Sequence, residues 1–194
     1  KFSPKFKEFI DSTKLIKSPE LEIEEVGVPH KIKWDKCKLE TVSFGHGITT
    51  TPVQAASIYA AIANGGKLIK PSLIQNRKSK VTKNLISPET SKTMSDILRK
   101  VVSDKEGTAH LADKVGYHVG GKTGTAESYG NTKNRINTFI SIFPTSKPKY
   151  TLLVMLENPQ INRDLIYDYR GVKTKANYNT SGWNSVYVAG KIIK

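Results

Sequence analysis

The 194-residue chain is 37% hydrophobic and 25% charged, a composition typical of a folded domain long enough to bury an apolar core. It carries 31 Lys and Arg against 17 Asp and Glu, but the basic residues are scattered from Lys1 to Lys194 without a stripe that alternates with aromatic residues. This spread argues against a nucleic-acid-binding protein, although a basic surface that faces an anionic membrane or cell-wall polymer remains open.

Three further classes are disfavoured by the composition. No apolar run approaches the roughly 18 to 20 residues that cross a bilayer, and there is no signal peptide, so we expect any membrane anchor to lie outside this chain. The single cysteine, Cys37, excludes an internal disulfide, and we expect it to be a small buried side chain rather than a nucleophile. Four dispersed histidines lack metal-ligand spacing, so no metal or other cofactor is expected.

The front part of the chain is predicted to start with a short amphipathic helix within residues 1–17, with Pro4 in its first turn. Residues 20–38 contain several helix breakers and are expected to be irregular. Thr51 is then a predicted N-cap, with Pro52 at the first helical position and Gln54 completing a capping box. This helix is apolar almost all round up to Asn64, so we expect it to be buried.

A short extended piece over 67–72 should follow, and then a polar hairpin or loop that reaches residue 85. A second helix is predicted to begin at Pro88, capped by Ser87, and to stop near Asp104. Its apolar stripe consists of Met94, Ile97, Leu98, Val101 and Val102. Residues 108–114 are expected to form a loop or a single helical turn.

The back part is predicted to be rich in strands, at 120–126, 138–143 and 150–157. The short turn over 144–148 makes the last two strands antiparallel neighbours. After Pro159 we expect a polar loop to Tyr178, which includes the cluster Tyr167 to Arg170, and then a closing helix over 181–194.

The segment with the clearest chemistry is Gly-Gly-Lys-Thr-Gly-Thr-Ala-Glu at 120–127. The Lys122 ammonium, the hydroxyls of Thr123 and Thr125 and the backbone N–H groups together favour an anion site for a carboxylate. Gly124 would let a ligand approach the backbone closely. In a strand, Lys122 and Gly124 face one side and the two threonines face the other, so a twist or bulge is needed to bring Lys122 into the cleft of Thr125. The alternative is a surface hairpin strand with a solvated lysine.

Several motifs carry a family resemblance. The run Lys122 to Thr125 resembles the third signature of the penicillin-recognising serine acyltransferases. The segment from Ser43 to Gln54 resembles the S-F-G-x-G-x-x-x-T-P-x-Q segment of class B, high-molecular-mass penicillin-binding proteins, and Glu106 to Ala109 resembles their G-T-A turn. The resemblance covers most of the chain and is strongest to the division-type, penicillin-binding-protein-3-like peptidoglycan D,D-transpeptidases.

The resemblance implies an α+β fold, with an antiparallel sheet and helices on both of its faces. It implies that Lys122 supplies positive potential to the carboxylate of a D-Ala-D-Ala stem peptide, or of a β-lactam, and that the hydroxyls of Thr123 and Thr125 bind that carboxylate. The backbone N–H of Thr125 would be one oxyanion donor. Gly121 and Gly124 would keep the strand accessible. Further implications are divisome partners such as a glycosyltransferase, and an anchored parent at the periplasmic face of the bacterial inner membrane.

Two signatures of that family are missing from the sequence. The only S-x-x-K match is Ser146 to Lys149, which has Pro148 inside it and lies in a predicted turn, so it is rejected as the nucleophile. No S-x-N occurs. We therefore expect the chain to be the C-terminal portion of a transpeptidase domain, helical over about 1–115 and with the sheet and closing helix over about 116–194, and to be inactive alone. A non-catalytic, penicillin-sensing module of the same fold is the alternative, with a basic nucleic-acid-binding domain as the more distant one.

Overall fold

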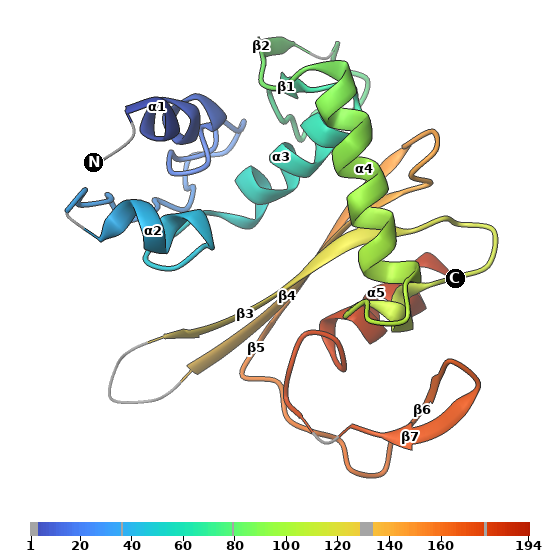
Figure 1. Ribbon diagram of the computed structural model, residues 1–194. Coiled ribbons are helices and arrows are strands. Elements are labelled where there is room, and N and C mark those ends of the chain that lie inside the picture. Colours follow the sequence, from blue (N-terminus) through green and yellow to red (C-terminus); the bar gives the residue numbers. More distant parts are fainter. Residues whose placement is uncertain (1–3, 36, 79, 129–133, 177) are drawn as a thin grey trace. The chain divides into compact units, whose positions relative to one another are not determined.

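The computed structural model describes residues 4–35, 37–78, 80–128, 134–176 and 178–194 (Figure 1). The chain divides into two compact units, Lys1–Pro88 and Glu89–Lys194. The helix and single turn that follow Pro88, which the sequence pattern places with the helical part up to about residue 115, therefore lie in the same unit as the sheet.

Among its described residues, the first unit contains three helices and a small hairpin: α1 (Pro4–Thr13), α2 (Lys38–Ser43), α3 (Pro52–Ala63), β1 (Lys67–Ile69) and β2 (Val81–Asn84). The helix predicted near the start is confirmed as α1, and the polar hairpin is confirmed by the antiparallel pairing of β1 with β2. Helix α2 was not predicted from the sequence. Cys37 directly precedes it and is exposed, so the prediction of a buried cysteine is wrong.

Helix α3 begins as its capping residues predict, but its cap differs in one respect. The Thr51 hydroxyl accepts a hydrogen bond from the Gln54 N–H at 3.2 Å. The Gln54 side chain instead donates to the carbonyls of Lys14 and Lys17, at 2.6 and 3.2 Å, so it ties the end of the α1 segment to α3. Within α3 only Gln54, Ala61 and Ile62 are buried, and most of its other apolar side chains are half-buried, so the helix is less enclosed than predicted.

The second unit contains α4 (Pro88–Ser103), the 3-10 turn η1 (His110–Ala112), β3 (Gly120–Ser128), β4 (Asn134–Phe143), β5 (Tyr150–Glu157), β6 (Ile166–Tyr169), β7 (Val172–Lys175) and α5 (Ser185–Ile193). Strands β3, β4 and β5 form one antiparallel sheet in that order, which confirms the three predicted strands (Figure 1). In the part of the chain that the structure describes, β3 is therefore an edge strand.

Three predictions in this unit need correction. The expected polar loop after Pro159 contains the antiparallel hairpin β6–β7, and Tyr167 within it is only 5% exposed because its ring packs edge-on against Trp183 and Tyr187. The closing helix begins at Ser185 rather than at residue 181. Ile97, placed in the apolar stripe of α4, is half exposed, and the buried side chains of α4 are Ser91, Ser95, Leu98 and Val102.

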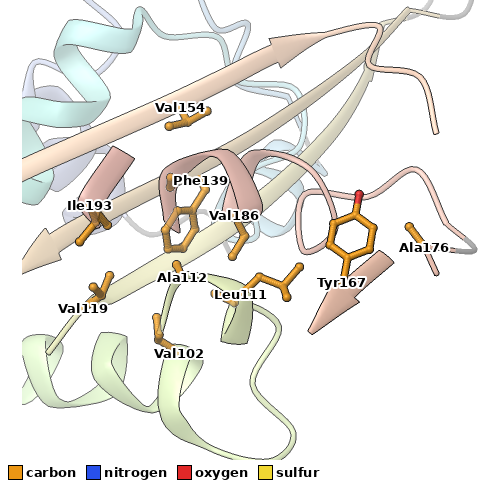
Figure 2. Close-up of a cluster of buried hydrophobic side chains, with 12 residues drawn as sticks. Val102, Leu111, Ala112, Val119, Phe139, Val154, Tyr167, Ala176, Val186 and Ile193 are labelled. Atoms are coloured by element: carbon orange, nitrogen blue, oxygen red, sulfur yellow. The ribbon is translucent and has the colours of Figure 1, made fainter. Parts of the chain in front are cut away.

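The core of the second unit lies against one face of the sheet. Phe139 of β4 is fully buried and pairs in register with Thr123 on one side and with Val154 on the other. Figure 2 shows Phe139 beside Val186 of α5, in a cluster that also contains residues of η1 and α4. Because side chains alternate along a strand, Thr123 and Thr125 project from this same face of the sheet.

Candidate functional site

Strand β3 keeps an uninterrupted antiparallel register with β4 over nine residue pairs. Thr123 pairs with Phe139 and Thr125 with Asn137, whereas Lys122 pairs with Ile140 and Gly124 with Thr138. Within these pairs no bulge rotates Lys122 toward the threonines. The alternation predicted from the sequence therefore holds: the two threonine side chains leave the strand on one face and the Lys122 side chain leaves it on the other.

Thr123 and Thr125 line a cavity of about 430 Å³. The other described residues that line it come from the turn after α4, from the end of β6 and from the loop before α5: Lys105, Glu106, Gly107, Thr108, Tyr169, Thr180, Ser181, Gly182 and Trp183. Five of the eleven lining residues carry an aliphatic hydroxyl, so the cavity offers hydrogen-bond donors and acceptors to a polar ligand.

Lys122 lies outside this set of lining residues. Its side chain is exposed and its Nζ donates to the carbonyl of Thr123 at 2.9 Å, so the ammonium lies close to the strand backbone. The predicted grouping of Lys122 with Thr125 in one cleft is thus not what the structure shows for the side chains. The charge instead lies beside the strand that carries the two hydroxyls.

The turn at Glu106 to Ala109 contacts the strand through one hydroxyl pair. Thr108 Oγ1 lies 3.0 Å from Thr123 Oγ1. The turn is attached to the end of α4, because the Ala109 N–H donates to the Val101 carbonyl at 3.1 Å and the Gly107 N–H to the Asp104 carbonyl at 2.9 Å. These two segments, which only the family resemblance connects in the sequence, are therefore in direct contact.

The loop before α5 contacts Thr125. Ser181 is only 1% exposed, and its hydroxyl donates to the Gly124 carbonyl. The Ser181 hydroxyl also lies 3.3 Å from Thr125 Oγ1, and the Ser181 N–H donates to that same oxygen at 3.4 Å. Each threonine of the strand thus has a hydroxyl partner from a different segment of the chain.

A second polar group holds this loop further along the strand. Arg135 of β4 forms an ion pair with Glu127 at 2.5 Å and donates to the Asn179 carbonyl at 3.0 Å. Asn137, which is fully buried, donates to the Asn179 side-chain oxygen at 3.1 Å. Glu127 is consequently engaged with its neighbouring strand.

The two glycines singled out in the strand serve different ends. A Cβ at Gly121 would lie 2.6 Å from both the Ile140 carbonyl oxygen and the Phe139 ring, so close packing requires glycine there. A Cβ at Gly124 would meet nothing nearer than Thr138 at 4.0 Å. Gly124 is exposed and leaves open space beside the backbone, as a site for a closely bound ligand would need.

Sequence reasoning missed Ser181, Thr180, Tyr169 and Trp183 as lining residues. The run Thr-Ser-Gly at the start of the expected closing helix was an available signal, but nothing local connects it to residues 123–125. Tyr169 was placed in a solvated loop, whereas its ring lies 5.3 Å from that of Trp183. The Tyr169 ring also meets the ring of His110 edge-on, and burial and the nearby Arg170 lower the pKa of His110.

Other candidate residues are placed away from this cavity or outside the description. Ser146, the serine of the rejected S-x-x-K match, is exposed in the turn between β4 and β5, which is no helix. Tyr129, for which the sequence favours a surface position rather than one at the rim of the cleft, lies outside the described residues. Among the described residues no group of three or more His, Cys, Asp or Glu could hold a metal ion, and no helix is long and apolar enough to cross a membrane.

Comparisons with known proteins agree on one family. The model of the penicillin binding protein transpeptidase domain matches residues 5–179. The "Probable peptidoglycan D,D-transpeptidase FtsI" of Caulobacter vibrioides is 31% identical over 195 residues, which cover 93% of this chain and 31% of that protein. The "Peptidoglycan D,D-transpeptidase FtsI" of Escherichia coli K12 is 31% identical over 140 residues, covering 70% of this chain and 24% of that protein.

The solved structures give the same fold. The transpeptidase domain of Burkholderia pseudomallei penicillin-binding protein 3 superposes with a TM-score of 0.79 at 22% identity, covering 99% of this chain and 57% of that one. A structure named as a peptidoglycan glycosyltransferase from Burkholderia ambifaria gives a TM-score of 0.72 at 21% identity. The chain spans less than a third of the length of the two curated relatives described above. On its sequence and its fold, this chain belongs to the penicillin-binding protein transpeptidase domain family, and is similar to the class B, FtsI-type members.

Proposed function

We propose that the full-length protein is a peptidoglycan D,D-transpeptidase and that β3 forms the wall of its site that holds the C-terminal carboxylate of a D-Ala-D-Ala stem peptide. The observation that carries this proposal is that the hydroxyls of Thr123 and Thr125 face one cavity on an edge strand. Family membership supports the reaction class, and the arrangement of these two side chains supports the role that we propose for this chain within it.

The wall suits a carboxylate chemically. A carboxylate has two oxygens that only accept hydrogen bonds, and two hydroxyls two positions apart on a strand can each donate to one of them. Hydrogen bonds to a charged group stabilise by about 1.5–3 kcal/mol each. The exposed Lys122 ammonium beside the same strand adds positive potential without a direct contact. A β-lactam carries an equivalent carboxylate and would occupy the same wall.

The backbone of β3 contributes a second element of the mechanism. Because β3 lies at the edge of the sheet, part of its N–H and C=O groups are free of ladder partners, and we assign the N–H of Thr125 as one of two oxyanion donors. A serine in the remainder of the full-length protein would attack the carbonyl between the two D-Ala residues. The peptide C–N bond then breaks, the terminal D-Ala leaves as the protonated amine, and the acyl group passes to an amine of a second stem peptide.

In this proposal the nucleophile and the second oxyanion donor lie outside residues 1–194, so these residues alone should be inactive. Loss of one oxyanion donor costs about 10²–10³-fold in rate, and loss of the nucleophile removes the covalent step altogether, so residues 1–194 would not be acylated by themselves. We place the full-length protein at the periplasmic face of the bacterial inner membrane, anchored by a segment other than those described, where a cell-division glycosyltransferase would supply its glycan substrate.

The test is the acylation of the full-length protein by a fluorescent penicillin, with Thr125→Val compared with the parent. The substitution removes one hydroxyl donor but keeps the backbone N–H, so the apparent affinity for the penicillin should fall about 10-fold or more. Thr151→Val on β5, a half-buried threonine of the same sheet, is the matched control and should behave as the parent. Absence of labelling in the parent, or labelling of Thr125→Val with parental affinity, would refute the proposal.

A further inference from the structure

Ser181 forms hydrogen bonds with both residues of the Gly124–Thr125 peptide. Its hydroxyl has a single hydrogen, which it donates to the Gly124 carbonyl. In the contact between the Ser181 and Thr125 hydroxyls the donor is then Thr125, whose single hydrogen can rotate to a carboxylate when a ligand binds. Thr125 Oγ1 in turn accepts from the Ser181 N–H. One buried residue therefore binds both the side chain of Thr125 and the carbonyl of the residue before it.

The Gly124 carbonyl and the Thr125 N–H belong to one planar peptide unit, and they point in opposite directions. A hydrogen bond that fixes the oxygen therefore also fixes the direction of the N–H. The pairing with Thr138 of β4 holds Gly124 from one side, and the Ser181 hydroxyl adds a second constraint at a residue that has no Cβ to limit its backbone dihedrals. A donor on the carbonyl also polarises the amide, which strengthens the N–H as a donor.

Ser181 is itself held in place. Its carbonyl accepts from the Ser185 hydroxyl at 3.2 Å and from the Val186 N–H at 3.0 Å, in the first turn of α5. The next residue, Gly182, packs so closely on the turn after α4 that a Cβ there would lie 2.8 Å from the Thr108 carbonyl oxygen. The hydroxyl that contacts β3 is thus carried by a segment that is anchored on two sides.

We propose that Ser181 is a positioning residue for the oxyanion donor: it orients the Gly124–Thr125 peptide so that the Thr125 N–H points at the reacting carbonyl. This inference rests on the proposed function. It assigns to the loop before α5, 56 residues away in the sequence from Thr125, a part in the chemical step rather than in carboxylate binding. A loss of orientation should therefore lower the rate of acylation and leave the initial binding of the ligand nearly unchanged.

The experiment measures acylation of the full-length protein by a chromogenic or fluorescent penicillin in the pre-steady state, where the non-covalent dissociation constant and the acylation rate constant are obtained separately. Ser181→Ala is expected to lower the acylation rate constant about 10-fold, less than the loss of a whole oxyanion donor, and to change the dissociation constant less than about twofold. Ser181→Cys retains a weak donor of similar size and should fall between Ser181→Ala and the parent.

Ser141→Ala is the matched control, because Ser141 is also a fully buried serine of this unit whose hydroxyl donates to a strand carbonyl, that of Leu152. It should acylate as the parent does. In protein labelled with ¹⁵N, the Thr125 amide resonance should shift in Ser181→Ala and not in Ser141→Ala. If Ser181→Ala does not fold, Ser181→Cys carries the same comparison.

The outcomes separate this inference from the proposed function. A parent that is acylated, with a Ser181→Ala variant of equal acylation rate, overturns the positioning role and leaves the proposed function intact. Equal slowing by Ser181→Ala and Ser141→Ala would also overturn it, because the effect would then be a general loss of packing. A parent that no penicillin acylates overturns the proposed function itself.

Discussion

The two units of the chain are stabilised in different ways. In Glu89–Lys194, apolar side chains from α4, η1, β4, β5 and α5 form one buried cluster around Phe139. In Lys1–Pro88, the described buried apolar side chains other than proline are small in number and are spread over separate elements: Ile10, Val42, Ala61, Ile62 and Leu68. Its loops are held instead by hydrogen bonds from side chains to backbone carbonyls. Gln54 donates to the carbonyls of Lys14 and Lys17, and Thr50 donates to that of Leu15.

This difference indicates where the chain can tolerate change. A continuous apolar cluster gives a cooperative unit in which backbone amides exchange only on global opening, whereas loops held by single hydrogen bonds open locally. The proposed ligand wall lies in the first kind of unit, on the face of the sheet that carries the core. A rigid sheet beneath Thr123 and Thr125 suits a site whose donors have to be held in fixed positions.

The largest loss of stability is expected when a cavity is made in the core of the second unit. Phe139→Ala should destabilise the second unit by about 3–5 kcal/mol, because it removes a fully buried ring and leaves a void beside Val186 and Val154. Amide exchange across β3 to β5 should accelerate accordingly. Val115→Ala, at a fully exposed position, should change it by less than about 0.5 kcal/mol. A loss below about 1 kcal/mol for Phe139→Ala would show that this cluster does not dominate the unit.

A smaller effect is expected when a polar tether is removed from the first unit. Gln54→Ala removes the side-chain donor to the carbonyls of Lys14 and Lys17, of which the Lys14 carbonyl also accepts from the Lys17 N–H, and should cost about 1–3 kcal/mol locally. Exchange should accelerate in α1 and the start of α3, while β3 to β5 remain protected. Gln75→Ala, at an exposed position of the same unit, serves as the control. Equal acceleration in both units would contradict the description of the chain as two differently stabilised parts.

The smallest effect is a pH dependence confined to the first unit. Hydrogen bonds to the Glu22 carboxylate, first from the Leu73 N–H and then from the Ser72 hydroxyl, together with the nearby Arg77, lower the pKa of Glu22 from 4.5 to about 2. Since the folded state favours the ionised carboxylate, the stabilisation is complete above pH 4.5 and is lost as the pH falls from 4.5 towards 2. Exchange of the amides near residues 72–77 should accelerate over that interval, and Glu22→Gln should abolish this pH dependence. A parent that shows no change over the interval would refute the assignment.

The features that could be predicted from the sequence are those determined by residues that are close together in the chain. The bounds of β5 were predicted because an apolar run lies between Pro148 and Pro159, and the start of α3 was predicted from Thr51 and Pro52. The faces of Lys122 and Thr123 were predicted because alternation in a strand depends only on neighbouring residues. The residues that determine each of these features lie within about ten positions of one another in the chain.

The features that were missed depend on distant contacts. The hairpin β6–β7 looks like a polar loop in sequence, and Tyr167 is buried there because Trp183 and Tyr187 of a later segment pack on it. Ser181 belongs to the site because the loop before α5 folds back onto β3, which no periodicity reveals. The lining of the cavity by Tyr169 and Trp183 has the same origin.

The most direct test of the ligand wall uses the charge beside it. In the full-length protein, Lys122→Ala should slow labelling by a fluorescent penicillin by about 10-fold or more, because the positive potential at the carboxylate wall is lost, whereas Lys149→Ala, an exposed lysine in the turn before β5, should label at the parental rate. Equal labelling of the parent, Lys122→Ala and Lys149→Ala would contradict the claim that β3 faces the ligand.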